Sequence, residues 1–114
     1  MDYSFRFVND KLNKELMKRL AKEGVKHHID KEGVIHYSSD DEDVVGNEIL
    51  PSMRDRMFSR WQIISCPSEW ADRYRRYMVQ NSISFVEELL DNKMCFLISR
   101  DHRPQSWRLD ESED

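Results

Sequence analysis

The chain has 114 residues, of which 39% are hydrophobic, 35% charged and 11% aromatic, and its formal net charge is −4. A chain of this length forms about one domain around one core, and its aromatic content excludes an intrinsically disordered protein. No apolar run approaches the roughly 18 residues of a membrane-spanning helix, and the N-terminus lacks the layout of a secretory signal. We therefore expect a soluble, cytoplasmic protein with a single α/β domain at residues 1–109 and a flexible acidic tail at residues 110–114.

The first part of the chain predicts a strand, a helix and a β-hairpin. Residues 3–7 alternate apolar and polar side chains, as a half-buried strand does. Asn9 or Asp10 is suited to cap a following helix, and Gly24 is suited to end it in the left-handed conformation. The apolar face of this helix repeats every four residues and comprises Leu12, Leu16 and Leu20.

Residues 25–30 and 34–38 predict the two strands of the hairpin, joined by a short loop that contains Gly33. If Asp30 pairs with Val34, the strand register follows for every other residue. The resulting cross-strand pairs are Ile29 with Ile35, His28 with His36 and His27 with Tyr37.

A helical stretch from about residue 41 to residue 59 separates this part from the rest of the chain. Val45, Ile49, Met53 and Met57 recur every four residues, which predicts one buried stripe. Pro51 should kink this helix or split it in two, because proline lacks the backbone donor and crowds the preceding turn.

The second half repeats the order of the first. Residues 61–64 predict a strand, Ser68 a helix cap, and residues 83–90 and 94–99 two strands around a turn at 91–93. A shift of 58 residues superposes the two apolar helix faces, the second of which comprises Trp70, Tyr74 and Met78. The predicted fold is α/β (α+β), with two βαββ-like halves joined by a helix. We expect a mixed or mostly antiparallel sheet of about six strands, with the helices packed on one face.

Few residues suggest catalysis, and we expect no catalytic set, no metal site and no cofactor. His28 and His36 are close enough to share a metal, but a transition-metal site needs a third fixed ligand. Cys66 and Cys95 form no zinc motif, and we expect them to be buried reduced thiols. The three glycines leave no phosphate-binding or dinucleotide-binding loop. A catalytic dyad formed only in space stays open.

Charge is the strongest surface signal. Residues 30–50 contain seven acidic residues and one lysine, whereas residues 51–80 contain six arginines and three acidic residues. The run Asp40, Asp41, Glu42 and Asp43 has two interpretations: support for a helix start through the helix dipole, or a docking surface for a basic partner. The arginines have two interpretations: a nucleic-acid interface, or a solvated face with internal ion pairs. We favour the solvated face, because a chain with net negative charge is atypical of a nucleic-acid binder.

The leading functional hypothesis is a small protein-interaction module. Its specific version is an immunity-type inhibitor that binds a basic partner such as a nuclease toxin. Asp40, Asp41, Glu42 and Asp43 are the predicted partner-binding residues. One alternative is a small-molecule-sensing regulatory domain, and another is a metal- or thiol-dependent enzyme. We expect no membrane partner, the charge weighs against nucleic acid, and a homodimer stays open.

Overall fold

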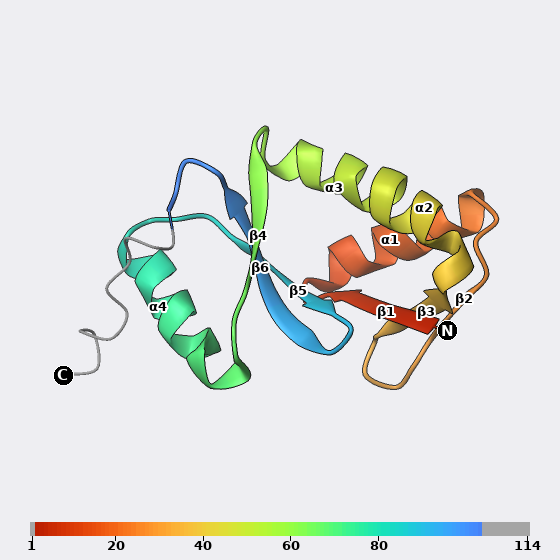
Figure 1. Ribbon diagram of the computed structural model, residues 1–114, viewed down its shortest axis with the longest axis horizontal. Coiled ribbons are helices and arrows are strands. Elements are labelled where there is room, and N and C mark those ends of the chain that lie inside the picture. The colour runs from red at the N-terminus through yellow and green to blue at the C-terminus, as the bar shows by residue number, and fades with distance from the viewer. Residues whose placement is uncertain (1, 104–114) are drawn as a thin grey trace.

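The chain forms a six-stranded sheet in the order β2-β3-β1-β5-β6-β4, and every neighbouring pair of strands is antiparallel (Figure 1). This is a computed structural model, and it describes residues 2–103. The strands are β1 (Asp2–Phe7), β2 (His27–Ile29), β3 (Ile35–Ser38), β4 (Trp61–Ser65), β5 (Val86–Leu90) and β6 (Lys93–Ser99). The α-helices are α1 (Asp10–Lys22), α2 (Glu42–Val44), α3 (Leu50–Met57) and α4 (Ala71–Gln80). Short 3-10 turns, η1 (Ser39–Asp41) and η3 (Ser68–Trp70), and a π-helical turn, η2 (Val45–Ile49), complete the elements. The α+β class, the six strands and the antiparallel pairing are confirmed.

The two halves have the same strand order. The elements β1-α1-β2-β3 pair as β2-β3-β1, and the elements β4-α4-β5-β6 pair as β5-β6-β4. The helical stretch from η1 to α3 joins them, and β1 pairs with β5 to make one continuous sheet. The two βαββ units predicted from the sequence are therefore present as structural units.

The helices lie on both faces of the sheet, so the prediction of a single helix-bearing face is wrong. Phe5 and Phe7 pair with Leu90 and Glu88, and these side chains share the face that α1 and α3 cover. Phe96 pairs with Glu87, the residue before Glu88 on β5. Because side chains alternate along a strand, Phe96 points to the other face of the sheet, where α4 covers it.

The antiparallel pairing of β1 with β5 explains this arrangement. It reverses the strand directions of the second unit while keeping the left-to-right order of its strands. Only a half-turn about an axis that lies in the sheet and crosses the strands does both. That rotation also exchanges the two faces, so a second unit of the same handedness carries its helix on the opposite side.

Both helices of the repeated unit end in the same way. The Val25 amide donates to the Leu20 carbonyl at 2.9 Å, and the Ile83 amide donates to the Met78 carbonyl at 2.8 Å. The residue before each donor has a positive φ, 73° at Gly24 and 56° at Ser82. This is the Schellman type of helix end. Both motifs fall at positions related by the 58-residue shift.

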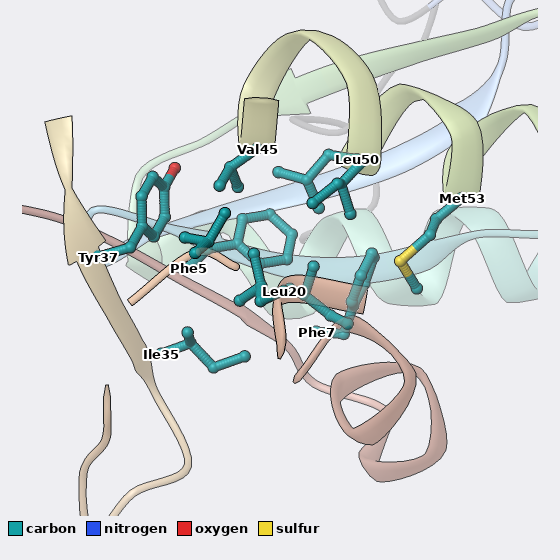
Figure 2. Packing of buried hydrophobic residues seen from close by; sticks show 11 residues of the cluster. Phe5, Phe7, Leu20, Ile35, Tyr37, Val45, Leu50 and Met53 are labelled. Carbon is teal, nitrogen blue, oxygen red and sulfur yellow. The ribbon is translucent and has the colours of Figure 1, made fainter. Parts of the chain in front are cut away.

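The larger core lies between the sheet and the pair α1 and α3 (Figure 2). The buried stripe of the central helical stretch faces Phe5 and Phe7 of β1 across this core. Its buried members are Phe5, Phe7, Leu16, Leu20, Val25, Ile35, Tyr37, Val45, Ile49, Leu50 and Met53. The smaller core lies under α4 and contains Ala71, Met78, Ile83, Phe96 and Ile98, with Tyr74 partly buried against it.

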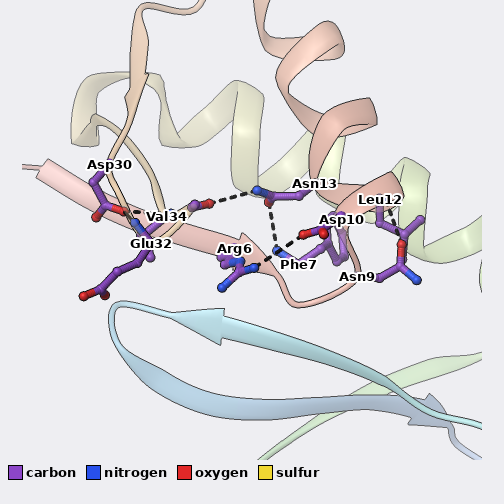
Figure 3. Close-up of polar contacts among 10 residues, drawn as sticks. Arg6, Phe7, Asn9, Asp10, Leu12, Asn13, Asp30, Glu32 and Val34 are labelled. Carbon is purple, nitrogen blue, oxygen red and sulfur yellow. Dashed lines mark hydrogen bonds and ion pairs between the residues drawn. The ribbon is translucent and has the colours of Figure 1, made fainter.

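Asn13 ties three segments together within the larger half (Figure 3). Its side-chain carbonyl accepts from the Phe7 amide at 3.1 Å, and its amide group donates to the Gly33 carbonyl at 2.9 Å. Asn9 caps the same helix, as predicted, by accepting from the Leu12 amide. The asparagine inside the helix thus fixes the end of β1 and the hairpin loop, a role that the sequence pattern did not indicate.

The central helical stretch is continuous, and it changes pitch just before Pro51. The turn Val45–Ile49 is π-helical, and α3 begins at Leu50 with Pro51 in its first turn. A wider turn accommodates the proline ring and the lost backbone donor without a break in the helix.

Three local predictions of the second half need correction. Ser68 does not cap α4 with its side chain, because a 3-10 turn begins there and leads into the helix. Strand β5 begins at Val86 rather than at Ile83, whose amide is held by the end of α4. The hairpin turn has only two residues, Asp91 and Asn92, both with positive φ as in a type I′ turn.

Candidate functional site

The acidic run begins the central helical stretch. Ser38 accepts from the Asp40 amide at 3.1 Å, which caps the turn η1, and α2 starts at Glu42. Asp40 and Asp43 are exposed, and Asp41 is half-buried. The run therefore has the position that the helix-start interpretation requires, while two of its carboxylates remain open to solvent.

Glu42 faces inward. The Tyr37 hydroxyl donates to Glu42 Oε2 at 2.9 Å, and Tyr37 itself is buried in the larger core. Burial raises the pKa of Tyr37 above its usual value, and the hydrogen bond to Glu42 and the charges of Glu42 and Asp91 add to this shift. A Cβ atom at position 46 would overlap with the Glu42 carboxylate, so Gly46 provides the room for it. Glu42 is thus a structural member of the run.

Two distant residues join this run in space. Asp2 is the cross-strand neighbour of Ser38, two residues before Asp40. Asp91 exchanges hydrogen bonds with Ser4: its carboxylate accepts from the Ser4 amide at 2.9 Å, and its own amide donates to the Ser4 carbonyl. Both aspartates are exposed.

We call this set of six carboxylates the acidic end; it comprises Asp2, Asp40, Asp41, Glu42, Asp43 and Asp91. Figure 1 shows the start of β1, the end of β3 and α2 close together. Within residues 2–103, no lysine or arginine forms an ion pair with any of the six. Asp2 and Asp91 could not be assigned to this set from the sequence, because only the pairing of β1 with β3 and β5 brings them here.

His28 and His36 lie opposite each other in the predicted register, on the face of the sheet that α1 and α3 leave open. Their rings are stacked, with centroids 4.7 Å apart and planes at 9°. Asp30 Oδ2 lies 2.9 Å from His36 Nε2, and this hydrogen bond, with a second from the Val34 amide, lowers the pKa of Asp30. The described residues contain no group of three or more His, Cys, Asp or Glu side chains that could hold a metal ion. Parallel rings direct their lone pairs in parallel, which does not suit a shared metal.

Several of the six arginines form internal ion pairs. Arg75 contacts Glu87 and Asp72, and Arg56 contacts Glu15. Arg54 differs from the prediction of a solvated face, because it is only 5% exposed and forms two hydrogen bonds with the buried Glu88. Glu87 and Glu88 are neighbours on β5 and therefore point to opposite faces of the sheet.

Neither cysteine forms a disulfide; Cys95 is buried and Cys66 is half-buried. Burial raises the pKa of both thiols, which keeps them protonated at neutral pH. Cys66 borders a surface depression of about 380 Å³, lined by Ser65, Cys66, Pro67, Ser68, Asn92, Lys93 and Met94.

The acidic tail predicted at residues 110–114 lies outside the described residues. No helix within residues 2–103 has both the length and the apolar character to cross a bilayer. Comparison with known proteins finds no matching family model, no matching curated protein and no matching solved structure.

Proposed function

We propose that this protein is a protein-interaction module whose acidic end docks on a basic partner protein. The observation that carries the proposal is the gathering of exposed carboxylates from β1, η1, α2 and the β5–β6 turn, with no ion pair to a lysine or arginine of the described chain. Uncompensated charge of one sign speeds the encounter with an oppositely charged partner and fixes its orientation.

In its specific form, the proposal is an immunity-type inhibitor that covers the active site of a basic nuclease toxin. Small size and net negative charge support this form. We place its action in the reducing cytoplasm, which the two unbridged cysteines support.

The test separates the two interpretations of the acidic run. Glu42 is unsuited to it, because its loss disturbs Tyr37. The informative variant is Asp40→Asn with Asp43→Asn, which neutralises two exposed charges. The matched control is Glu32→Gln with Glu69→Gln, which removes two exposed charges from the β2–β3 loop and from η3.

The tagged protein first captures partners from a lysate of its native host, and mass spectrometry identifies them. Association with the captured partner is then measured at low and high salt. We expect the Asp40→Asn, Asp43→Asn variant to associate more slowly at low salt and to lose much of its salt dependence, whereas the control variant matches the wild type. An unchanged on-rate in the first variant, or a captured partner of acidic character, contradicts the proposal.

A further inference from the structure

The second charged feature of the surface is a pair of neighbouring arginines. Arg60 lies just before the start of β4, and Arg100 lies just after the end of the antiparallel strand β6. Trp61 pairs with Ser99 in the ladder, so Arg60 and Arg100 are the next opposed residues. The Arg100 amide donates to the Arg60 carbonyl at 2.9 Å, which extends the ladder to this pair. Directly opposed residues of an antiparallel pair have Cβ atoms about 5 Å apart, and like charges there are destabilising.

The position of Arg100 is fixed by a further contact. Since the Arg60 carbonyl faces β6, the next carbonyl along the strand, that of Trp61, faces the open edge of β4. Arg100 Nε donates to this Trp61 carbonyl at 2.8 Å. The guanidinium group therefore folds around the strand, and its two Nη groups form no hydrogen bond within residues 2–103.

No carboxylate neutralises the pair. Neither arginine forms an ion pair within the described part of the chain. Of the aspartates close to the pair in the sequence, Asp55 accepts from the Trp61 indole at 2.7 Å, and Asp101 is exposed and forms no ion pair within residues 2–103. The two arginines thus occupy directly opposed positions, and neither has an ion-pair partner within residues 2–103.

The pair borders a concave surface. A depression of about 290 Å³ is lined by Ser59, Arg60, Trp61 and Arg100. The Trp61 side chain is held by its hydrogen bond to Asp55 and by the Arg54 guanidinium, 5.1 Å from the ring centroid. Like charges on directly opposed strand residues are unfavourable, yet the fold places two arginines there. Such unfavourable local arrangements are typical of functional positions.

We propose that this depression binds a dianionic phosphate, as inorganic phosphate or as a phosphomonoester. Guanidinium groups match the geometry of phosphate oxygens and donate two hydrogen bonds each. The charge distinguishes among phosphates, because a phosphomonoester carries close to two negative charges at neutral pH and so balances two arginines, whereas each phosphodiester of a nucleic acid carries one. This site lies apart from the acidic end, and its existence does not depend on the proposed function.

The test is a titration followed by the backbone amide NMR signals of residues 59–61 and 99–101. Inorganic phosphate, phenyl phosphate and sulfate should bind saturably, and dimethyl phosphate, a monoanion, should bind at least about tenfold more weakly. Phenyl phosphate binding should weaken below about pH 6, where the phosphomonoester takes up a proton, and sulfate binding should not.

The variants separate this site from general attraction to positive charge. Arg60→Gln should weaken phosphate binding about tenfold or more, and Arg76→Gln, which removes an exposed arginine from α4, should leave it unchanged. In buffer without phosphate or sulfate, Arg60→Gln should melt at the same temperature as the wild type or higher, since it removes the repulsion.

Three outcomes would overturn the proposal. The first is equal phosphate binding by Arg60→Gln and the wild type. The second is a lower melting temperature of Arg60→Gln in the anion-free buffer, because the opposed arginines would then not repel each other. The third is binding of dimethyl phosphate or of a single-stranded oligonucleotide as tight as that of phosphate, which would assign the site to phosphodiesters.

Discussion

Arg54 and Glu88, which are 34 residues apart in the sequence, form a buried bidentate ion pair. Arg54 Nη2 donates to Glu88 Oε1 at 2.6 Å and Arg54 Nε to Glu88 Oε2 at 3.1 Å. The guanidinium also lies 5.8 Å from the ring centroid of Phe5 and 5.1 Å from that of Trp61. One side chain thus links α3 to β5, β1 and β4, the strands of both halves.

Removal of Arg54 should destabilise the protein strongly. The variant Arg54→Met leaves the Glu88 carboxylate buried without a partner, and we expect a loss of about 3–5 kcal/mol in the free energy of unfolding, measured by urea denaturation. The double variant Arg54→Met, Glu88→Leu removes both charges and should recover most of this loss. A double variant as unstable as the single one would contradict the electrostatic explanation.

The same variant should show a distinctive pH dependence. Burial raises the pKa of Glu88 above its ordinary 4.5, and Arg54 counteracts the rise. Without Arg54, the folded state keeps the Glu88 proton at pH values where the unfolded chain has released it. The unfolding free energy therefore falls as the pH rises through that range, so the deficit against the wild type should be larger near pH 8 than near pH 5.

The two cores should respond alike to truncation. Leu16 of α1 and Met78 of α4 are fully buried, so each helix of the repeated unit contributes one of them. Leu16→Ala and Met78→Ala should each cost about 2–5 kcal/mol through lost apolar contact and the cavity left behind. Lys14→Ala, on the exposed side of α1, serves as the control and should change stability by less than about 0.5 kcal/mol. A cost below about 1 kcal/mol at Leu16 or Met78 would contradict the packing.

Gly46→Ala should destabilise the protein although alanine favours helices. The new Cβ displaces the Glu42 carboxylate from the Tyr37 hydroxyl. The lost charge-assisted hydrogen bond outweighs the gain in helix propensity, and the net loss should be about 1 kcal/mol. The pKa of Tyr37 should fall toward its ordinary 10.0, which an ultraviolet titration of the tyrosines detects. In a Tyr37→Phe background the same substitution should be neutral or stabilising; a loss as large as in the wild type would argue against this mechanism.

Zinc should not bind stoichiometrically to His28 and His36 at neutral pH. The rings are parallel, and the Nε2 atom of His36 is engaged by Asp30. Titration calorimetry checks this directly. A sub-micromolar affinity that is lost in His28→Ala would show that the rings turn to share a metal.

The short-range pattern of the sequence was sufficient to predict the order of the main helices and strands and the complete register of one hairpin. The 25–38 hairpin pairs as predicted, from Ile29 with Ile35 to His27 with Tyr37, because its loop length and its alternation leave one pairing that places its apolar side chains on one face. The Asn9 cap and the left-handed Gly24 follow for the same reason, since each depends on residues within one helical turn.

Only the tertiary structure decided where these units lie relative to each other. The pairing of β1 with β5 spans more than 80 residues, and it turned the second unit over, which moved α4 to the opposite face. The same pairing brought Asp91 to Ser4. No local periodicity encodes such a contact, because it depends on how two complete units bury their remaining apolar surfaces.

The charged residues show this division most clearly. From the sequence, Arg54 and Arg60 are equivalent members of one basic stretch, and Asp91 is a turn residue. The fold buries Arg54 against Glu88, leaves Arg60 opposite Arg100, and adds Asp91 to the acidic end. The identity of a charged residue determines its charge, whereas its partners and its dielectric surroundings exist only after the strands have paired.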